Sequence, residues 1–253
     1  MADHTTTPHT TTPHTNDELL ARIEELERRL AQQGTTATTT DATHVDIWFL
    51  LDRSGSMQAI ADDVVGGFDT FFAEQRRLDG TATVTLVQFD GQAPHDVLVD
   101  AEPLDRVGSL RGRFQPRGNT PLYDAIGQLL ARAERHVARG GNPADQLVVI
   151  FTDGHENASR EHTPEQINQR IAGLRAQGWT FVFLGANQDS YATGGRIAMA
   201  AGSTANFAAT PAGVAASYEG LHRAVAEFRG KARAKRVADA DRFWGDVKES
   251  EVR

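Results

Sequence analysis

The sequence predicts an α/β fold, a doubly wound and mostly parallel central sheet flanked by helices. Three observations support this prediction. Short apolar runs alternate with amphipathic helical patterns from residue 45 onward, which is the order expected of a parallel sheet. The runs Val45–Leu51 and Gln146–Asp153 are almost continuously apolar, as strands covered by helices on both faces must be. Each of these two runs leads into an aspartate with glycine close behind.

Composition supports one large domain with appendages. The chain has 253 residues, 40% of them apolar, which is enough to bury a core. Its formal net charge of −8 argues against a general affinity for nucleic acid or anionic membrane, because both need clustered Lys and Arg. Cysteine is absent, which excludes disulfides and thiolate zinc sites. The sequence has no signal-peptide pattern and no apolar run of about eighteen residues, so we expect no membrane span and a cytoplasmic protein.

The amino-terminal tail repeats a five-residue unit. Residues 1–15 contain HTTTP twice and lack the apolar side chains that packing requires. We expect a disordered, solvated tail. The alternatives are a metal-binding histidine tract and a set of Thr-Pro phosphorylation sites at Thr7 and Thr12.

A short coiled-coil helix is predicted at residues 16–33. Its apolar residues follow the spacing of a heptad seam, and they are Leu19, Ile23, Leu26 and Leu30. Two heptads alone are marginal in water. The seam must therefore pair with another copy of itself or dock onto the same chain, and the sequence leaves both open. The Thr-rich residues 34–43 are predicted to form a linker.

The strands of the main domain, residues 44–230, are predicted from short apolar or alternating runs. Continuous apolar runs indicate strands buried on both faces. Val97 and Val99 instead alternate with polar neighbours, which is typical of an edge strand. The predicted strands are 45–51, 81–90, 95–100, 146–153, 179–186 and 206–208.

Helices are predicted between these strands, and prolines and glycines mark their ends. Pro121 and Pro164 fit the first turn of a helix, where a missing amide hydrogen costs nothing. Gly178 closes the second of these helices. A helix is expected around Gly194 and Gly195 in spite of their low helix propensity. The predicted helices are 60–80, part of 104–118, 121–139, 163–177, 190–201 and 211–229, with a helical extension at 231–253.

Oxygen-bearing side chains stand where three of these segments end or begin. Three of them follow the first strand at intervals of two residues, one precedes the helix 121–139, and one ends the strand 146–153. They are Asp52, Ser54, Ser56, Thr120 and Asp153. In an open α/β sheet, ligand sites lie beyond the carboxyl ends of strands where the strand order switches. We therefore expect these side chains to converge there.

The chemistry of this set predicts a Mg²⁺ site. Carboxylates and hydroxyls are hard oxygen ligands, which suit Mg²⁺ and disfavour metals that prefer Cys or His. Mn²⁺ and Ca²⁺ are further candidates. The set is large enough to hold one octahedral ion and still leave a coordination position for water or a ligand. The pattern D-x-S-x-S alone also fits ordinary turns and helix caps, so Thr120 and Asp153 are essential to the prediction.

The chain resembles the von Willebrand factor type A domain with its metal-ion-dependent adhesion site. The motif D-x-S-x-S stands at residues 52–56, the motif threonine is Thr120 in GNTPLYDA, and the motif aspartate is Asp153 in TDG. The resemblance covers residues 45–229, and segments such as FLLDRSGSM and FVFLGANQD are similar to a bacterial and phage branch of the family. Asn119 stands where many relatives have glycine, which changes the freedom of that loop.

The resemblance implies a role for each residue of the motif. Ser54 and Ser56 would bind the metal directly, and Thr120, Asp52 and Asp153 would do so directly or through water. An open coordination position would accept an Asp or Glu side chain from a protein partner. The charges agree with this, because two carboxylates neutralise Mg²⁺ and leave no excess negative charge to repel the incoming acid.

A non-enzymatic, Mg²⁺-dependent protein-interaction module within a larger assembly is therefore the expected function. A Mg²⁺-dependent phosphohydrolase is one alternative, because the same ligands polarise phosphoryl groups. The chain has no Walker-type loop and no nucleophile elbow, which counts against it. A structural subunit whose metal only fixes loops is the other alternative.

Further polar residues near these segments receive separate predictions. For Asp124 we favour stabilisation of the first helical turn by its charge over metal ligation. His155 and Glu156 either rim the partner-binding face or are solvated surface residues. We expect Phe243 and Trp244 to pack back onto the domain. A basic run near the last helix is expected to be a solvated face, with partner docking as the alternative. It comprises Arg229, Lys231, Arg233, Lys235 and Arg236.

Overall fold

A computed structural model describes residues 44–140, 145–186 and 190–245. The predictions for the tail 1–15, the heptad helix 16–33 and the linker 34–43 lie outside the described residues, and self-association through the heptad seam stays a prediction. Among the helices that the structure describes, none combines the length and the apolar composition that crossing a membrane requires.

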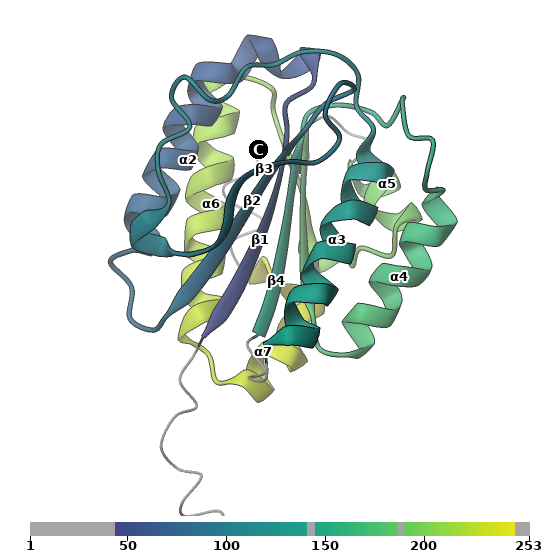
Figure 1. Cartoon of the computed structure of the whole chain (residues 1–253). Coiled ribbons are helices and arrows are strands. Elements are labelled where there is room, and N and C mark those ends of the chain that lie inside the picture. The colour runs from purple at the N-terminus through teal and green to yellow at the C-terminus, as the bar shows by residue number, and fades with distance from the viewer. Residues whose placement is uncertain (1–43, 141–144, 187–189, 246–253) are drawn as a thin grey trace, which may run out of the picture. The chain divides into compact units, whose positions relative to one another are not determined.

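A single mixed sheet forms the centre of the fold (Figure 1). Its six strands run in the order β3-β2-β1-β4-β5-β6. β3 is antiparallel to β2, and the other neighbours are parallel. The strands are β1 Val45–Asp52, β2 Ala82–Phe89, β3 Asp96–Pro103, β4 Asp145–Thr152, β5 Thr180–Ala186 and β6 Thr204–Phe207. The predicted α/β fold is confirmed, and the strand predicted from Val97 and Val99 lies at the edge.

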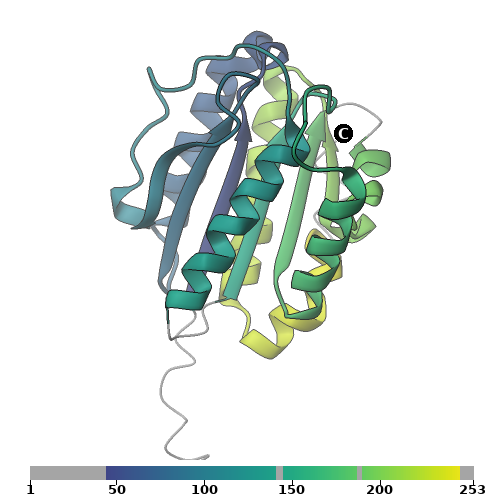
Figure 2. The same cartoon turned by 45° about the vertical axis from the view of Figure 1, so that its right-hand side comes forward.

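Helices cover both faces of this sheet, as the apolar strands require. α2 and α6 lie against one face, and α3, α4 and α5 lie against the other (Figures 1 and 2). The side chains of β1 alternate between the two layers, with Ile47, Phe49 and Leu51 in one core and Trp48 and Leu50 in the other. The helices are α2 Ala61–Gln75, α3 Leu122–Arg139, α4 Pro164–Ala176, α5 Ser190–Arg196, α6 Pro211–Gly230 and α7 Arg233–Asp239.

Two helices depart from their predicted bounds for local reasons. α2 ends at Gln75 and does not reach residue 80, and a 3₁₀ turn, Gly55–Ile60, connects it to β1. α5 ends at Arg196 and does not reach residue 201. The backbone amide of Met199 bonds back to the carbonyl of Gly194 at 2.9 Å, and Ala198 adopts a positive φ of 60°. This left-handed residue ends the helix, as helix C-caps commonly do.

The basic run near the last helix is a solvated face only in part, and the prediction was wrong for two of its residues. Arg229 and Arg236 are each 2% exposed. Arg236 bonds Asp145 at the start of β4 and the carbonyl of Phe228, so its charge is compensated inside the protein. The chain beyond α6 therefore folds back under the sheet, and Trp244 is fully buried there, as expected.

The strand order puts the topological switch point of the sheet at the carboxyl end of β1, and we call the region beyond this strand end the crevice. From β1 the chain continues to β2 on one side, and it later returns to β4 on the other side. The loops that follow β1 and β4 therefore turn away in opposite directions, which is the arrangement in which α/β sheets bind ligands.

Candidate metal-binding site

Asp52 lies at the bottom of this crevice, at the last position of β1, and its exposed fraction is 0%. One carboxylate oxygen accepts the amide hydrogen of Ser54 at 2.6 Å, and the other accepts the hydroxyl hydrogen of Thr152 at 2.5 Å. Burial raises the pKa of Asp52 to about 6, although these hydrogen bonds lower it. A nearby cation would compensate the buried negative charge.

The loop after β1 turns back at Gly55 and brings Ser54 and Ser56 together. The Gly55 amide donates to the carbonyl of Gly118 at 3.0 Å, so the loop is held against a second loop. The two serine Oγ atoms are 3.1 Å apart, and Ser56 Oγ donates to Asp153 Oδ1 at 2.6 Å. Ser56 therefore connects the loop after β1 with the loop after β4.

Thr120 is placed by the loop that follows β4. Its amide donates to Asn157 Oδ1 at 2.9 Å, and the Asn157 amide donates to the Thr120 carbonyl at 3.1 Å. These reciprocal hydrogen bonds fix the backbone of the two loops relative to each other. Thr120 is 2% exposed, and its hydroxyl faces the crevice beside Gly154.

The space beside Gly154 is where the hydroxyls and carboxylates meet. A β-carbon added to Gly154 would lie 2.8 Å from Thr120 Oγ1, 3.3 Å from Asp52 Oδ2 and 3.4 Å from Ser54 Oγ. Together with the Ser56–Asp153 hydrogen bond, these distances show that the five side chains named from the sequence converge. Their role as metal ligands stays a prediction.

The donor set fits a hard divalent cation. Burial also raises the pKa of Asp153, and the hydrogen bond from Ser56 opposes this. Two buried carboxylates thus share a small space with three hydroxyls, and such oxygens are the ligands that Mg²⁺ and similar ions prefer. Within the described ranges no group of three or more His, Asp or Glu is arranged to hold a metal. Any site at the crevice therefore depends on its hydroxyls.

Arg53 supports the loop of the site, a role that sequence reasoning missed. It follows Asp52 directly, yet its side chain points away from the crevice residues to Asp90 and Asp96. Thr152, which bonds Asp52, and Asn157, which bonds Thr120, were also not predicted. In the sequence, Thr152 differs from any strand threonine only by its position before Asp153, so little in the pattern marks these supporting roles.

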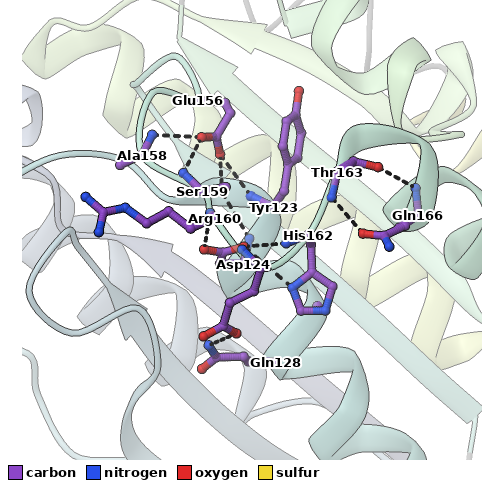
Figure 3. Close-up of polar contacts among 12 residues, drawn as sticks. Tyr123, Asp124, Gln128, Glu156, Ala158, Ser159, Arg160, His162, Thr163 and Gln166 are labelled. Atoms are coloured by element: carbon purple, nitrogen blue, oxygen red, sulfur yellow. Dashed lines mark hydrogen bonds and ion pairs between the residues drawn. The ribbon is translucent and has the colours of Figure 1, made fainter.

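Two acidic residues, Asp124 and Glu156, fix the loop after β4 through its backbone amides (Figure 3). Asp124, in the first turn of α3, accepts the amide hydrogens of Arg160, Glu161 and His162 at 2.7 to 2.9 Å. Its carboxylate therefore anchors that loop, a role the sequence did not indicate.

Glu156 makes a similar set of contacts within the same loop. It accepts the amide hydrogens of Tyr123, Ala158 and Ser159 at 2.7 to 3.0 Å. Glu156 thus ties the loop to the start of α3, so it is neither a free rim residue nor an ordinary solvated one. His155, by contrast, is exposed.

These features define a Rossmann-like α/β domain with a candidate cation site at the switch point of its strand order. The family model of the von Willebrand factor type A domain matches residues 46–217. The chain belongs to this family. No curated protein sequence matches the chain.

Several solved structures are similar to the chain. One is the pilus adhesin SpaC from Lactobacillus rhamnosus GG in its open conformation, with 14% identity over 73% of this chain and 30% of that one, and a TM-score of 0.55. Another is the manganese-loaded TRAP protein of Plasmodium vivax, with 18% identity over 66% of this chain and 69% of that one, and a TM-score of 0.48. A third is a von Willebrand factor type A protein from Catenulispora acidiphila, with 19% identity over 71% of this chain and 42% of that one, and a TM-score of 0.46. The chain spans less than half the length of SpaC and of the Catenulispora protein. At these identities the likeness is one of fold.

Proposed function

We propose that this protein is a Mg²⁺-dependent protein-interaction module that binds an acidic side chain of a partner at the crevice. The single observation that carries this proposal is the convergence of Asp52, Ser54 and Thr120 around the space beside Gly154, with Ser56 and Asp153 joined next to it. Mn²⁺ or Ca²⁺ is an alternative ion for the same oxygen ligands.

The residues would divide the work between holding the ion and holding the loops. Ser54, Ser56 and Thr120 would offer neutral oxygens, while Asp52 and Asp153 would supply the two negative charges. Bound there, Mg²⁺ would act as a Lewis acid that accepts an oxygen from an incoming carboxylate. Because the two aspartates already balance the ion's charge, a third carboxylate would meet little repulsion.

Support for an interaction role over an enzymatic one comes from the chemistry of the crevice and from the fold. The side chains that converge are two carboxylates and three hydroxyls. Neither serine is hydrogen-bonded to a histidine that would activate it as a nucleophile, among the hydrogen bonds of the described residues. The same fold also occurs in a pilus adhesin, a protein whose work is binding.

Metal binding is tested first, by titrating the full chain with MgCl₂ in a calorimeter. We expect saturable binding, and we expect Asp52→Asn to weaken it at least about tenfold, because even the outer-shell partners of a metal contribute that much to affinity. Asp105→Asn, at an exposed position outside the crevice, is the matched control and should bind normally. Absence of Mg²⁺, Mn²⁺ and Ca²⁺ binding by the unaltered chain would contradict the proposal.

Partner binding is tested by capturing proteins from a lysate of the source cells on the immobilised full chain, with Mg²⁺ or with EDTA. The expected result is a set of proteins that EDTA releases and that the Asp52→Asn variant fails to capture. An identical set under both conditions would indicate that the metal is structural. Hydrolysis of p-nitrophenyl phosphate that needs Mg²⁺ and is lost in Asp52→Ala would establish the phosphohydrolase alternative.

A further inference from the structure

A second hollow lies between α2 and α6, and none of its lining residues belongs to the crevice. It is a groove of about 470 Å³. Its floor is apolar and is formed by Phe71 and Tyr218, with Pro211 and Ala215 at the side of α6. An apolar groove between two surface helices is the usual shape of a site that receives a third, amphipathic helix.

The rim of this groove is acidic. Asp62, Asp63 and Glu74 line it from α2, and Glu219 lines it from α6. The first two lie in the first turn of α2, where carboxylates stabilise the helix. That reason does not apply to Glu74, which lies in the last turn of the same helix, where a negative charge is unfavourable.

The cationic side chain of Arg77 lies near the rim without cancelling its charge. Arg77 forms an exposed ion pair with Glu74, and such a pair is weak and easily exchanged. His222 also lines the groove, and its Nδ1 lies 3.1 Å from Gln75 Nε2. The groove therefore keeps a net negative rim that favours a cationic occupant.

Two adjacent glycines of α2 shape the groove. A β-carbon on Gly67 would lie 2.2 Å from the ring of Tyr218, so this glycine is required for α2 to pack on α6. A β-carbon on Gly66 would meet nothing within 4 Å. Glycine inside a helix lowers stability by about 1 kcal/mol relative to alanine. No packing contact within this chain requires a glycine at residue 66. Its bare backbone leaves room for an occupant.

We propose that the groove between α2 and α6 binds an amphipathic helix of a partner protein, whose apolar face is flanked by Lys and Arg. The apolar floor would receive the apolar face, and the rim carboxylates would pair with the flanking cations. A second copy of this chain is a poorer occupant, because its net charge of −8 would meet the same acidic rim. This inference does not depend on metal binding at the crevice.

A synthetic helix of Leu and Lys, about 18 residues or five turns long, provides the probe. Its fluorescence polarisation is measured with the full chain in EDTA, so that no metal ion takes part in the binding. We expect saturable binding that weakens at least tenfold in Gly66→Phe, which fills the groove. Gly173→Phe is the matched control and should bind normally, because Gly173 is also an exposed helical glycine with open space around it.

The rim is tested separately by reversing one charge. Glu219→Lys should weaken binding of the Leu-Lys helix at least tenfold, whereas Asp105→Lys, the same change at an exposed site outside the groove, should not. If Gly66→Phe fails to fold by circular dichroism, Glu219→Lys alone decides. Gly66→Ser adds little bulk and should retain binding.

Four results would overturn the proposal. The first is that the Leu-Lys helix does not bind the unaltered chain. The second is that Gly173→Phe weakens binding of this helix as much as Gly66→Phe does. The third is that a matched Leu-Glu helix binds equally well, which would remove the role of the acidic rim. The fourth is that sedimentation shows a dimer that Gly66→Phe dissociates, which would make a second copy of the chain the occupant.

Discussion

Arg53 donates a hydrogen bond from Nε to Asp90 Oδ2 across 2.8 Å, and both side chains are buried. Its Nη1 also donates to Gln88 and to Asp96. A single residue between Asp52 and Ser54 thus secures the loop after β1 to the neighbouring strands β2 and β3. The planar, multiply donating guanidinium suits this bridging role better than a lysine would.

Breaking this pair should destabilise the fold. We expect Asp90→Asn to lower the free energy of unfolding by about 3 kcal/mol at pH 7, because the Arg53 charge is left buried with one carboxylate fewer. Urea denaturation measures the change. Asp105→Asn, at an exposed position, should change it by less than about 0.5 kcal/mol. A loss below about 1 kcal/mol for Asp90→Asn would show that Asp96 alone compensates Arg53.

The same pair predicts a pH dependence. Burial raises the pKa of Asp90, but hydrogen bonds from the amides of Gln92 and Ala93 and from Arg117 and Arg53 outweigh it, so the net pKa is below its usual value. The ionised carboxylate therefore adds stability above the unfolded pKa of about 3.9, and this stability is lost as pH falls further. The stability difference between the unaltered chain and Asp90→Asn should be constant from pH 5 to 7 and shrink below about pH 4. A stability difference between the two proteins that stays constant down to pH 2.5 would show that the ionised Asp90 carboxylate is not its source.

Gly154→Ala should remove metal binding with little effect on the rest of the fold. The new methyl group would lie 2.8 Å from Thr120 Oγ1 and 3.3 Å from Asp52 Oδ2, within the space where the oxygens converge. We expect Mg²⁺ affinity to fall at least about tenfold in calorimetry. Gly108→Ala is the control, because a β-carbon there meets nothing within 4 Å. Equal affinity in both variants would place the ion elsewhere.

Arg236 and Lys235 are sequence neighbours that should respond very differently to substitution. Arg236→Met leaves Asp145 buried with only the more distant Arg233, and we expect a loss of about 3 kcal/mol in unfolding free energy. Lys235 pairs with Asp239 on the surface, so Lys235→Met should cost less than about 0.5 kcal/mol. Thermal and urea unfolding measure both, and similar small losses would mean that the buried pair contributes little.

Asp124→Ala should loosen the loop after β4. Removing the carboxylate leaves the amides of Arg160, Glu161 and His162 without their acceptor, so their hydrogen exchange should speed up by at least about tenfold. The amide of Ile150 in the central strand β4 serves as an internal reference and should exchange at its former rate. Unchanged exchange at residues 160–162 would show that other contacts hold the loop.

Much of the fold was predictable because burial on both faces leaves a clear pattern. β1 and β4 are fully buried strands, and their continuous apolar runs reveal this directly. The convergence at the crevice was predictable for a related reason. Parallel strands end at one edge, so polar residues at those ends must be neighbours.

Charged residues were harder to place, because sequence patterns treat them as solvated. Arg229 and Arg236 are buried only because backbone carbonyls and Asp145, far away in the sequence, receive their hydrogen bonds. Asp124 likewise bonds amides about 36 residues further on. Such partners depend on the tertiary fold, and no local spacing announces them.

The reciprocal hydrogen bonds between Thr120 and Asn157 have a kinetic consequence. Because these hydrogen bonds join the two loops within the fold, their backbone entropy would be lost during folding and not at each encounter with a proposed partner. Association would then proceed at the rate of ordinary docking of rigid surfaces, about 10⁵–10⁷ M⁻¹ s⁻¹. Differences in affinity among such partners would then arise mostly from how fast each one dissociates.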